Sequence, residues 1–312
     1  MKLMIGLPWY SGPDDSTFPL YFDQMSYYGG LRERTLWRDK LGHDKFMELL
    51  PTMPPLDMMP GKDGSADPTE EDWKRLGKLE LMISNYSRLS LVGKAREYIV
   101  DMCLDWDADY LLWWDSDMRF DHSTFLRLFR HDKPVVGALA FTARHPIHPV
   151  MYRVIEKWDS INKLDMIEGS DIVLDYPKDQ LVGNEEVNGK LAMGAAMTLY
   201  DMKVFKQIPK PWFSSTGCGE DFFFSVRCHK YNIPIYIDTA VKTQHKEHSP
   251  RWADEESYWR EREVARDSYV AQFGNNVGHI RDGELVQGKD IKQPSSNNKP
   301  EDVGVAMEGM IR

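Results

Sequence analysis

Short apolar runs recur along the chain, separated by segments in which apolar residues repeat every three or four positions. A strand that is apolar at every position is typical of a parallel sheet covered on both faces. The pattern therefore predicts buried strands rather than the alternating strands of a sheet with one face in water. The five runs are Lys2–Leu7, Tyr110–Trp114, Pro134–Ala140, Leu191–Tyr200 and Ile233–Asp238.

The helical repeat is clearest from about residue 86 to residue 105, just before the second of these runs. A second helix is predicted over Thr124–Arg130, and an apolar run again follows closely. Repeated helix-then-strand order predicts an α/β protein with a mostly parallel central sheet flanked by helices. A small antiparallel hairpin is expected at the sheet edge within residues 153–188. The apolar face of the first helix consists of Leu89, Val92, Ala95, Ile99, Cys103 and Trp106.

Three segments depart from this pattern. Aromatic residues from Trp9 to Tyr28 lie among turn formers, and we expect them to pack a long loop, with stacking on a nucleobase as the alternative. Residues 51–72 are rich in proline and methionine, which excludes a regular helix or central strand and predicts a surface insertion able to act as a lid. A single domain is predicted over residues 1–270. Residues 271–312 form a polar C-terminal arm, expected to be partly disordered unless it docks on a partner such as a second copy of the chain.

Composition and charge limit where the protein can reside and which partners it can bind. The 312-residue chain carries a net charge of −10, and its apolar runs are far shorter than the roughly 20 residues of a membrane span. The N-terminus lacks the long apolar core of a signal peptide, and three cysteines without CxxC spacing argue against disulfides and a zinc site. We therefore expect a cytoplasmic protein without a membrane span. Its acidic charge counts against duplex nucleic acid as a partner but does not exclude it.

An Asp-x-Asp pair, Asp115 and Asp117, ends the run at Tyr110–Trp114. In an open α/β sheet the carboxyl ends of the strands form the ligand crevice. Paired carboxylates there can share Mg²⁺ or Mn²⁺ with a diphosphate. The same spacing occurs upstream in the pairs Asp105/Asp107 and Asp107/Asp109, which we assign to a solvated turn. A polar strand end with a helix cap is the alternative for the downstream pair.

Other segments are candidates for the same ligand site. Pro8 ends the first strand, where a ligand loop is expected, and Gly194 lies in a small-residue stretch that another group can approach closely. Arg96 can approach a diphosphate, although a solvated helix face is the commoner explanation. Glu220 and Asp221 open a helix. Because the helix dipole favours carboxylates in a first turn, capping is the alternative to a chemical role.

Taken in order, these motifs resemble those of metal-dependent glycosyltransferases of the GT-A fold. They are more closely similar to the family-2-like glycosyltransferases of bacteria and bacteriophages. The resemblance spans about residues 2–250 and rests on Lys94-Ala95-Arg96, Asp115–Phe120, Gly219–Phe224 and His245. Glu97 stands where such relatives have asparagine, which puts any role carried over to that position in doubt.

The resemblance implies a Rossmann-like GT-A domain that moves a sugar from a nucleotide-sugar donor, with UDP-sugars favoured, to a hydroxyl acceptor. It implies that Asp117 and His245 ligate Mn²⁺ or Mg²⁺, with Asp115 sharing the ion or contacting the ribose. His248 is the substitute ligand. The cation would neutralise the departing nucleoside diphosphate.

The same resemblance implies roles for the remaining candidates. Asp221 becomes the catalytic base of an inverting displacement, and Glu220 orients the acceptor. The implied donor-binding residues are Pro8, Arg96, Asp115, Ser116 and Gly194.

Two other functions stay open. A nucleotidyltransferase shares the metal, the nucleoside and the α/β sheet, but releases pyrophosphate from a nucleoside triphosphate. The absence of a glycine-rich phosphate loop with a lysine near the first strand counts against it. A non-catalytic carbohydrate- or nucleotide-binding protein does not need an intact set of acidic residues. The acceptor is open among a glycan, a protein side chain, a lipid-linked sugar and a hydroxylated base in phage DNA.

Overall fold

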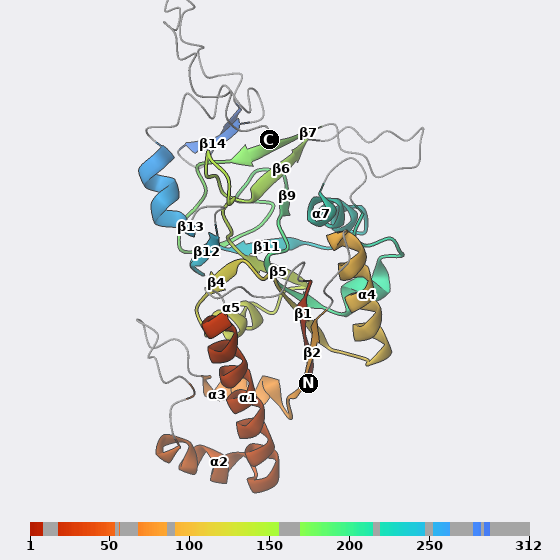
Figure 1. Ribbon diagram of the computed structural model, residues 1–312, viewed down its shortest axis with the longest axis vertical. Coiled ribbons are helices and arrows are strands. Elements are labelled where there is room, and N and C mark those ends of the chain that lie inside the picture. The colour runs from red at the N-terminus through yellow and green to blue at the C-terminus, as the bar shows by residue number, and fades with distance from the viewer. Residues whose placement is uncertain are drawn as a thin grey trace, which may run out of the picture.

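The architecture is that of a computed structural model (Figure 1). The structure describes residues 1–8, 18–53, 56, 68–85, 91–155, 169–214, 219–246, 252–262, 277–281 and 284–287. None of the helices in these described ranges is both long and apolar enough to cross a membrane.

A seven-stranded sheet forms the centre of the molecule, in the order β2-β1-β3-β10-β5-β11-β8. Five of its strands run parallel, whereas β10 and β8 run antiparallel to their neighbours. The predicted mostly parallel central sheet is therefore confirmed. In sheet order, the strands are Glu80–Asn85, Lys2–Leu7, Tyr110–Trp114, Met197–Asp201, Val135–Ala138, Ile235–Asp238 and Leu181–Val182.

Side chains of the central strands enter two separate cores, because successive residues of a strand point to opposite faces. Along β3, Leu111 and Trp113 belong to one core, whereas Leu112 and Trp114 belong to the other. Both cores are covered by helices, so every position of β3 after Tyr110 is buried. This arrangement explains the apolar runs without alternation.

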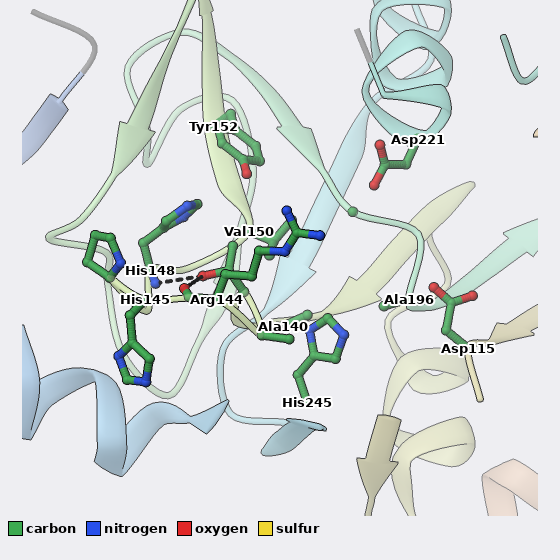
Figure 2. Close-up of a pocket in the computed structure, with 14 residues that line it drawn as sticks. Asp115, Ala140, Arg144, His145, His148, Val150, Tyr152, Ala196, Asp221 and His245 are labelled. Carbon is green, nitrogen blue, oxygen red and sulfur yellow. Dashed lines mark hydrogen bonds between the residues drawn. The ribbon is translucent and has the colours of Figure 1, made fainter. Parts of the chain in front are cut away.

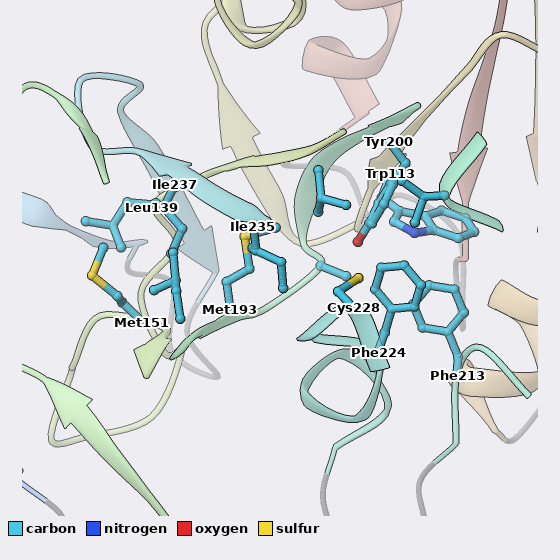
Figure 3. Close-up of a cluster of buried hydrophobic side chains, with 14 of the residues drawn as sticks. Trp113, Leu139, Met151, Met193, Tyr200, Phe213, Phe224, Cys228, Ile235 and Ile237 are labelled. Atoms are coloured by element: carbon cyan, nitrogen blue, oxygen red, sulfur yellow. The ribbon is translucent and has the colours of Figure 1, made fainter. Parts of the chain in front are cut away.

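Two groups of helices cover the two faces (Figure 1). Helices α4 (Val92–Asp105) and α7 (Glu220–Lys230) lie together on one side, and Figure 3 shows the rings of Phe213 and Phe224 stacked beside Trp113 in that core. The short helix α6 (Lys203–Gln207) adds Phe205 to it. The opposite core receives side chains from α1, α3 and α5. The remaining helices are α1 (Phe18–Leu41), α2 (His43–Leu49), the 3-10 turn Leu50–Thr52, α3 (Glu70–Leu76), α5 (Thr124–Arg130) and an unlabelled stretch at 255–262.

The aromatic segment predicted as a loop is largely helical, and the loop prediction is wrong from Phe18 onward. Helix α1 occupies these residues, and Tyr27 and Tyr28 are buried against the sheet. Burial of large rings there outweighs the weak helix propensity of tyrosine and glycine. Within the predicted insertion at 51–72, the last three residues already belong to α3, which begins with a capping box at Thr69.

Two smaller sheets accompany the central one in the described part of the chain. The predicted hairpin within 153–188 exists as the antiparallel pair β6–β7, but it belongs to a separate five-stranded sheet rather than to the edge of the central one. That sheet has the order β15-β14-β7-β6-β9, and the three-stranded sheet has the order β13-β12-β4. Their strands are β4 (Met118–Phe120), β6 (Met151–Ile155), β7 (Gly169–Val173), β9 (Lys190–Met193), β12 (Thr243–Lys246), β13 (Trp252–Asp254), β14 (Val277–Arg281) and β15 (Glu284–Gln287).

The apolar run at Leu191–Tyr200 is two strands rather than one. Strand β9 ends at Met193 in the five-stranded sheet, and β10 begins at Met197 in the central sheet. Residues Gly194 to Ala196 carry the chain from one sheet to the other. In the C-terminal arm, β14 pairs with β7 of the same chain.

Candidate functional site

Asp115 and Asp117 lie in the turn that leads from β3 into β4. The Asp115 backbone N–H donates to the Ala196 carbonyl over 2.9 Å, and the Met118 N–H donates back to the Asp115 carbonyl over 3.1 Å. The Asp-x-Asp turn is therefore fixed at the carboxyl end of β3, against the residues that connect β9 to β10. Ser116 lies in the same turn and is half-buried.

His245 is brought to Asp117 by strand pairing. In the β4–β12 register His245 lies opposite Met118, and the Lys246 N–H donates to the Asp117 carbonyl over 2.9 Å. The imidazole Nε2 is 3.1 Å from Asp117 Oδ2. Its Nδ1 lies 2.6 Å from the Phe141 carbonyl, which can only accept, so Nδ1 carries a proton.

This pair is held by charge as well as by geometry. Burial disfavours the charged form of His245, but the Asp117 carboxylate outweighs it, and the pKa of His245 lies above its ordinary value. Burial likewise opposes ionisation of Asp117, yet its hydrogen bond with His245 holds the pKa of Asp117 below the usual range. At metal-binding histidines a backbone carbonyl commonly accepts from one imidazole N–H, which leaves the other nitrogen for the metal.

Asp115 faces a different partner. Nη2 of Arg96 lies 3.1 and 3.0 Å from the two Asp115 carboxylate oxygens, and Arg96 Nε is 3.5 Å from Glu220 Oε1. Arg96 is only 2% exposed and packs over the Trp113 ring, so it supports Asp115 from behind. Burial raises the pKa of Asp115 to about 6, against the lowering effect of Arg96. Among the described residues, no group of three His, Cys, Asp or Glu side chains is gathered tightly enough to hold a metal alone.

Glu220 and Asp221 open α7, which approaches α4 closely. A Cβ on Gly93 of α4 would lie 3.2 Å from the Glu220 Cβ, so the absence of a side chain at residue 93 allows the two helices to meet. Asp221 accepts a hydrogen bond from the Phe222 backbone N–H over 2.7 Å. Burial raises the pKa of Asp221, and the neighbouring Glu220 charge adds to that effect.

These elements enclose a cavity of about 460 Å³ (Figure 2). Four residues predicted from the sequence line it together: Asp115, Gly194, Asp221 and His245. They come from the β3–β4 turn, the β9–β10 connection, the start of α7 and β12, which are far apart in sequence. A cavity of this size is in the range of small-molecule sites.

Other predicted residues lie outside the cavity lining. Arg96 and Glu220 pair behind Asp115, and Asp117 contacts the cavity residue His245. Pro8 is buried just after β1 and does not line the cavity. His248 lies outside the described residues.

Sequence reasoning missed one wall of the cavity. It is formed by residues between β5 and β6, and Figure 2 shows Arg144, His145, His148 and Tyr152 on this side. The available signal was the sequence Arg-His-Pro-Ile-His-Pro at 144–149, in which basic residues and prolines interrupt two apolar strands.

Glu97, which departs from the pattern of the resembled family, has a structural position. Its carboxylate accepts hydrogen bonds from the backbone N–H groups of both Trp212 and Phe213. It thereby ties α4 to the segment that precedes α7. Burial raises the pKa of Glu97, and these two backbone bonds oppose the rise.

Comparisons with known proteins give little further support. No protein-family model matches the chain, and no curated protein matches it. The crystal structure of A197 from STIV aligns over 78% of this chain and 85% of that chain, with 14% identity and a TM-score of 0.40. UDP-glucose pyrophosphorylase complexed with UDP-glucose aligns over 65% and 71%, with 9% identity and a TM-score of 0.29. A putative glucose-1-phosphate thymidylyltransferase from Bacillus anthracis aligns over 62% and 68%, with 16% identity and a TM-score of 0.27. These likenesses are too weak to carry an argument about function.

Proposed function

We propose that the protein is a glycosyltransferase that moves a sugar from a nucleotide-sugar donor, most favourably a UDP-sugar, to a hydroxyl acceptor. The observation that carries the proposal is the meeting of Asp115, Asp221 and His245 in one cavity, with Asp117 bonded to His245. The motif order that resembles family-2-like glycosyltransferases supplies the reaction class and the preference for uridine.

Asp117 and His245 are the proposed metal ligands. The two side chains are 3.1 Å apart, and a carboxylate with an imidazole suits Mn²⁺ better than Mg²⁺, because imidazole softens an otherwise oxygen site. Such ions commonly take only one or two carboxylates from a protein and complete their shell with water and substrate phosphate, which fits a set smaller than three. When bound, the cation would neutralise charge on the leaving diphosphate. Asp115 is held by Arg96 and is proposed to contact the donor.

Asp221 is the proposed base. In an inverting displacement the acceptor oxygen forms a bond to the anomeric carbon of the sugar, and the bond from that carbon to the β-phosphate oxygen breaks. The nucleoside diphosphate leaves with the bonding electron pair, and Asp221 takes the acceptor proton. A carboxylate whose pKa is raised by burial accepts a proton more readily near neutral pH. Glu220 contacts Arg96 and is proposed to keep the start of α7 in place for the acceptor.

The test is product analysis with UDP-sugars, with Mn²⁺ or with a chelator. Glycosyl transfer, or slow donor hydrolysis without an acceptor, releases UDP in a metal-dependent reaction. Release of pyrophosphate from UTP and a sugar phosphate would instead identify a nucleotidyltransferase. Nucleotide-sugar binding with no product would leave a non-catalytic binding protein.

Asp117→Ala is the matching variant. It should abolish the stabilisation by UDP that depends on Mn²⁺, because one of two protein ligands is lost. Asp39→Ala removes an exposed carboxylate from α1, outside the cavity, and serves as the control. Equal Mn²⁺-dependent binding of UDP by Asp117→Ala and the parent would refute the metal assignment.

A further inference from the structure

The wall that sequence reasoning missed is a hairpin, residues 140–150, which we call the basic hairpin. The Thr142 N–H donates to the His148 carbonyl over 3.0 Å, and the Val150 N–H donates to the Ala140 carbonyl over 2.8 Å. The base of the hairpin is fixed to β12, because Nδ1 of His245 contacts the Phe141 carbonyl over 2.6 Å. The basic hairpin and the proposed metal ligand therefore keep a fixed relation.

Arg144 is the permanent cation of this hairpin. Its backbone carbonyl accepts a bond from the Thr142 hydroxyl over 3.3 Å, which helps to hold the turn. Figure 2 shows its side chain reaching toward the middle of the cavity, with Asp221 and Asp115 on the opposite wall. Within the described part of the chain, its guanidinium has no ion-pair or hydrogen-bond partner.

The neighbouring histidines have other roles in this wall. Nδ1 of His145 lies 3.0 Å from Glu261 Oε2, outside the hairpin. His148 is 8% exposed, and burial lowers its pKa, which disfavours the charged form of its ring. The positive charge that the hairpin offers to the cavity is therefore carried by Arg144.

We propose that Arg144 binds the diphosphate of the donor, alongside the cation held by Asp117 and His245. This inference rests on the proposed function, and it assigns the basic hairpin as the diphosphate-binding wall of the cavity. A guanidinium presents a planar fork of donors that matches two phosphate oxygens. Negative charge grows on the diphosphate as its bond to the sugar breaks, so Arg144 stabilises the transition state more than the bound donor.

Calorimetry with the full chain tests the proposal, using UDP, UMP, uridine and inorganic pyrophosphate in the presence of Mn²⁺. Arg144→Gln should weaken binding of UDP and pyrophosphate about 10- to 100-fold, the scale of a lost charged hydrogen bond, and leave uridine binding unchanged. Arg144→Lys keeps the charge but loses the fork, and should fall between Gln and the parent. Lys45→Gln removes one exposed positive charge from α2, outside the cavity, and should bind every ligand as the parent does.

Each result separates this inference from the proposed function. If Arg144→Gln binds UDP and pyrophosphate as tightly as the parent, the inference fails, while Mn²⁺-dependent UDP binding by the parent keeps the proposed function. If Arg144→Gln weakens uridine binding as much as UDP binding, Arg144 shapes the cavity and does not bind phosphate. If the parent binds pyrophosphate as tightly as UDP, the nucleoside adds no affinity and the proposed function fails. Loss of pyrophosphate binding in Arg144→Gln would then still support an anion site at Arg144. A parent that binds neither UDP nor pyrophosphate overturns both.

Discussion

Three aspartates at the candidate site have the same chemistry but different surroundings. Burial raises the pKa of Asp115 to about 6, even with Arg96 beside it. Burial also opposes ionisation of Asp117, but the bond with His245 keeps its pKa low, as a metal ligand requires. Burial raises the pKa of Asp221, which suits a group that must take up a proton. The proposed roles of the three aspartates therefore differ because their surroundings differ.

The first prediction concerns Asp221→Asn. Asparagine keeps a carbonyl oxygen for the Phe222 N–H, so the start of α7 should stay intact. Turnover should fall about 10²-fold or more, the usual scale for losing a positioned base. Mn²⁺-dependent UDP binding, measured by thermal shift, should match the parent. Unchanged turnover would mean that this carboxylate only caps the helix, and a product with retained configuration would also exclude the role.

The second prediction concerns Gly6→Ala in β1. An added Cβ would lie 2.4 Å from a ring carbon of Trp113 on the neighbouring strand, and both residues lie in the centre of the sheet. We expect destabilisation of about 1–3 kcal/mol, the usual cost of overpacking a core. Chemical denaturation measures it. Gly29→Ala in α1 is the control, because its Cβ meets nothing within 4 Å and should not destabilise the protein.

At the scale of elements, helix ends and strand ends set the geometry of the site. Helix α7 begins at Glu220 and packs against α4 through Gly93, and that contact places Asp221 at the cavity. On the other face, α3 begins at Glu70 after a capping box at Thr69, and its Asp72 is also bonded to Arg130 of α5. One carboxylate thus fixes a helix start and joins two helices.

The third prediction concerns Asp72→Ala at pH 7. Asp72 is 2% exposed and lies 2.7 Å from Nη2 of Arg130, while Arg130 is partly solvated. Loss of the bond from the Thr69 backbone N–H and of the ion pair should cost about 2 kcal/mol of unfolding free energy. Glu70→Ala, which removes the contacts of an exposed carboxylate with Lys74 and His43, should have little effect. Equal losses in the two variants would contradict a special role for Asp72.

The same residue predicts a pH dependence. Burial opposes ionisation of Asp72, but its bonds with Arg130 and Thr69 win and lower its pKa in the folded state. A depressed folded pKa adds stability above the unfolded value of about 4, and this stability is lost as pH falls through the folded pKa. The difference between the parent and Asp72→Ala should therefore be constant from pH 7 to about pH 5 and shrink in more acidic buffer. If the stability difference between the parent and Asp72→Ala grows as the pH falls, the pKa of Asp72 is not lowered in the folded state.

At the scale of the whole molecule, the site joins parts of all three sheets. Asp115 follows a central strand, His245 lies in the three-stranded sheet, and Tyr152 belongs to the five-stranded sheet. The Gly194 connection passes between two of them. The cavity therefore depends on how the sheets and helices are docked, and contacts away from the cavity should influence activity.

The fourth prediction tests that dependence at Glu97. Glu97→Ala leaves the backbone N–H groups of Trp212 and Phe213, two buried residues, without their acceptor. Each such group costs about 1–3 kcal/mol, so we expect a loss of about 2–6 kcal/mol in stability and reduced turnover. Glu97→Gln keeps one acceptor oxygen and should lie between Ala and the parent. Denaturation and turnover are measured on the same samples. If Glu97→Ala has the stability and turnover of the parent, Glu97 does not hold α4 to the segment before α7.

The sequence by itself determined the elements whose signal is local. Strands β1 and β3 and helix α5 have the predicted bounds, because a continuous apolar run or a helical repeat records burial along a single segment. The place of Asp115 and Asp117 at a strand end follows from the same local pattern. The resemblance that pointed to Asp221 and His245 also depended only on motif order.

Only the tertiary structure decided how these pieces meet. The pairing of β4 with β12 brings His245 to Asp117, and the division of the run at Leu191–Tyr200 between two sheets places Gly194 beside Asp221. Both depend on contacts between residues distant in sequence. A short apolar run has the same pattern in either sheet, so periodicity could not locate the break. Arg144 was missed for the same reason, since an exposed arginine in a loop gains its meaning only from the cavity that it faces.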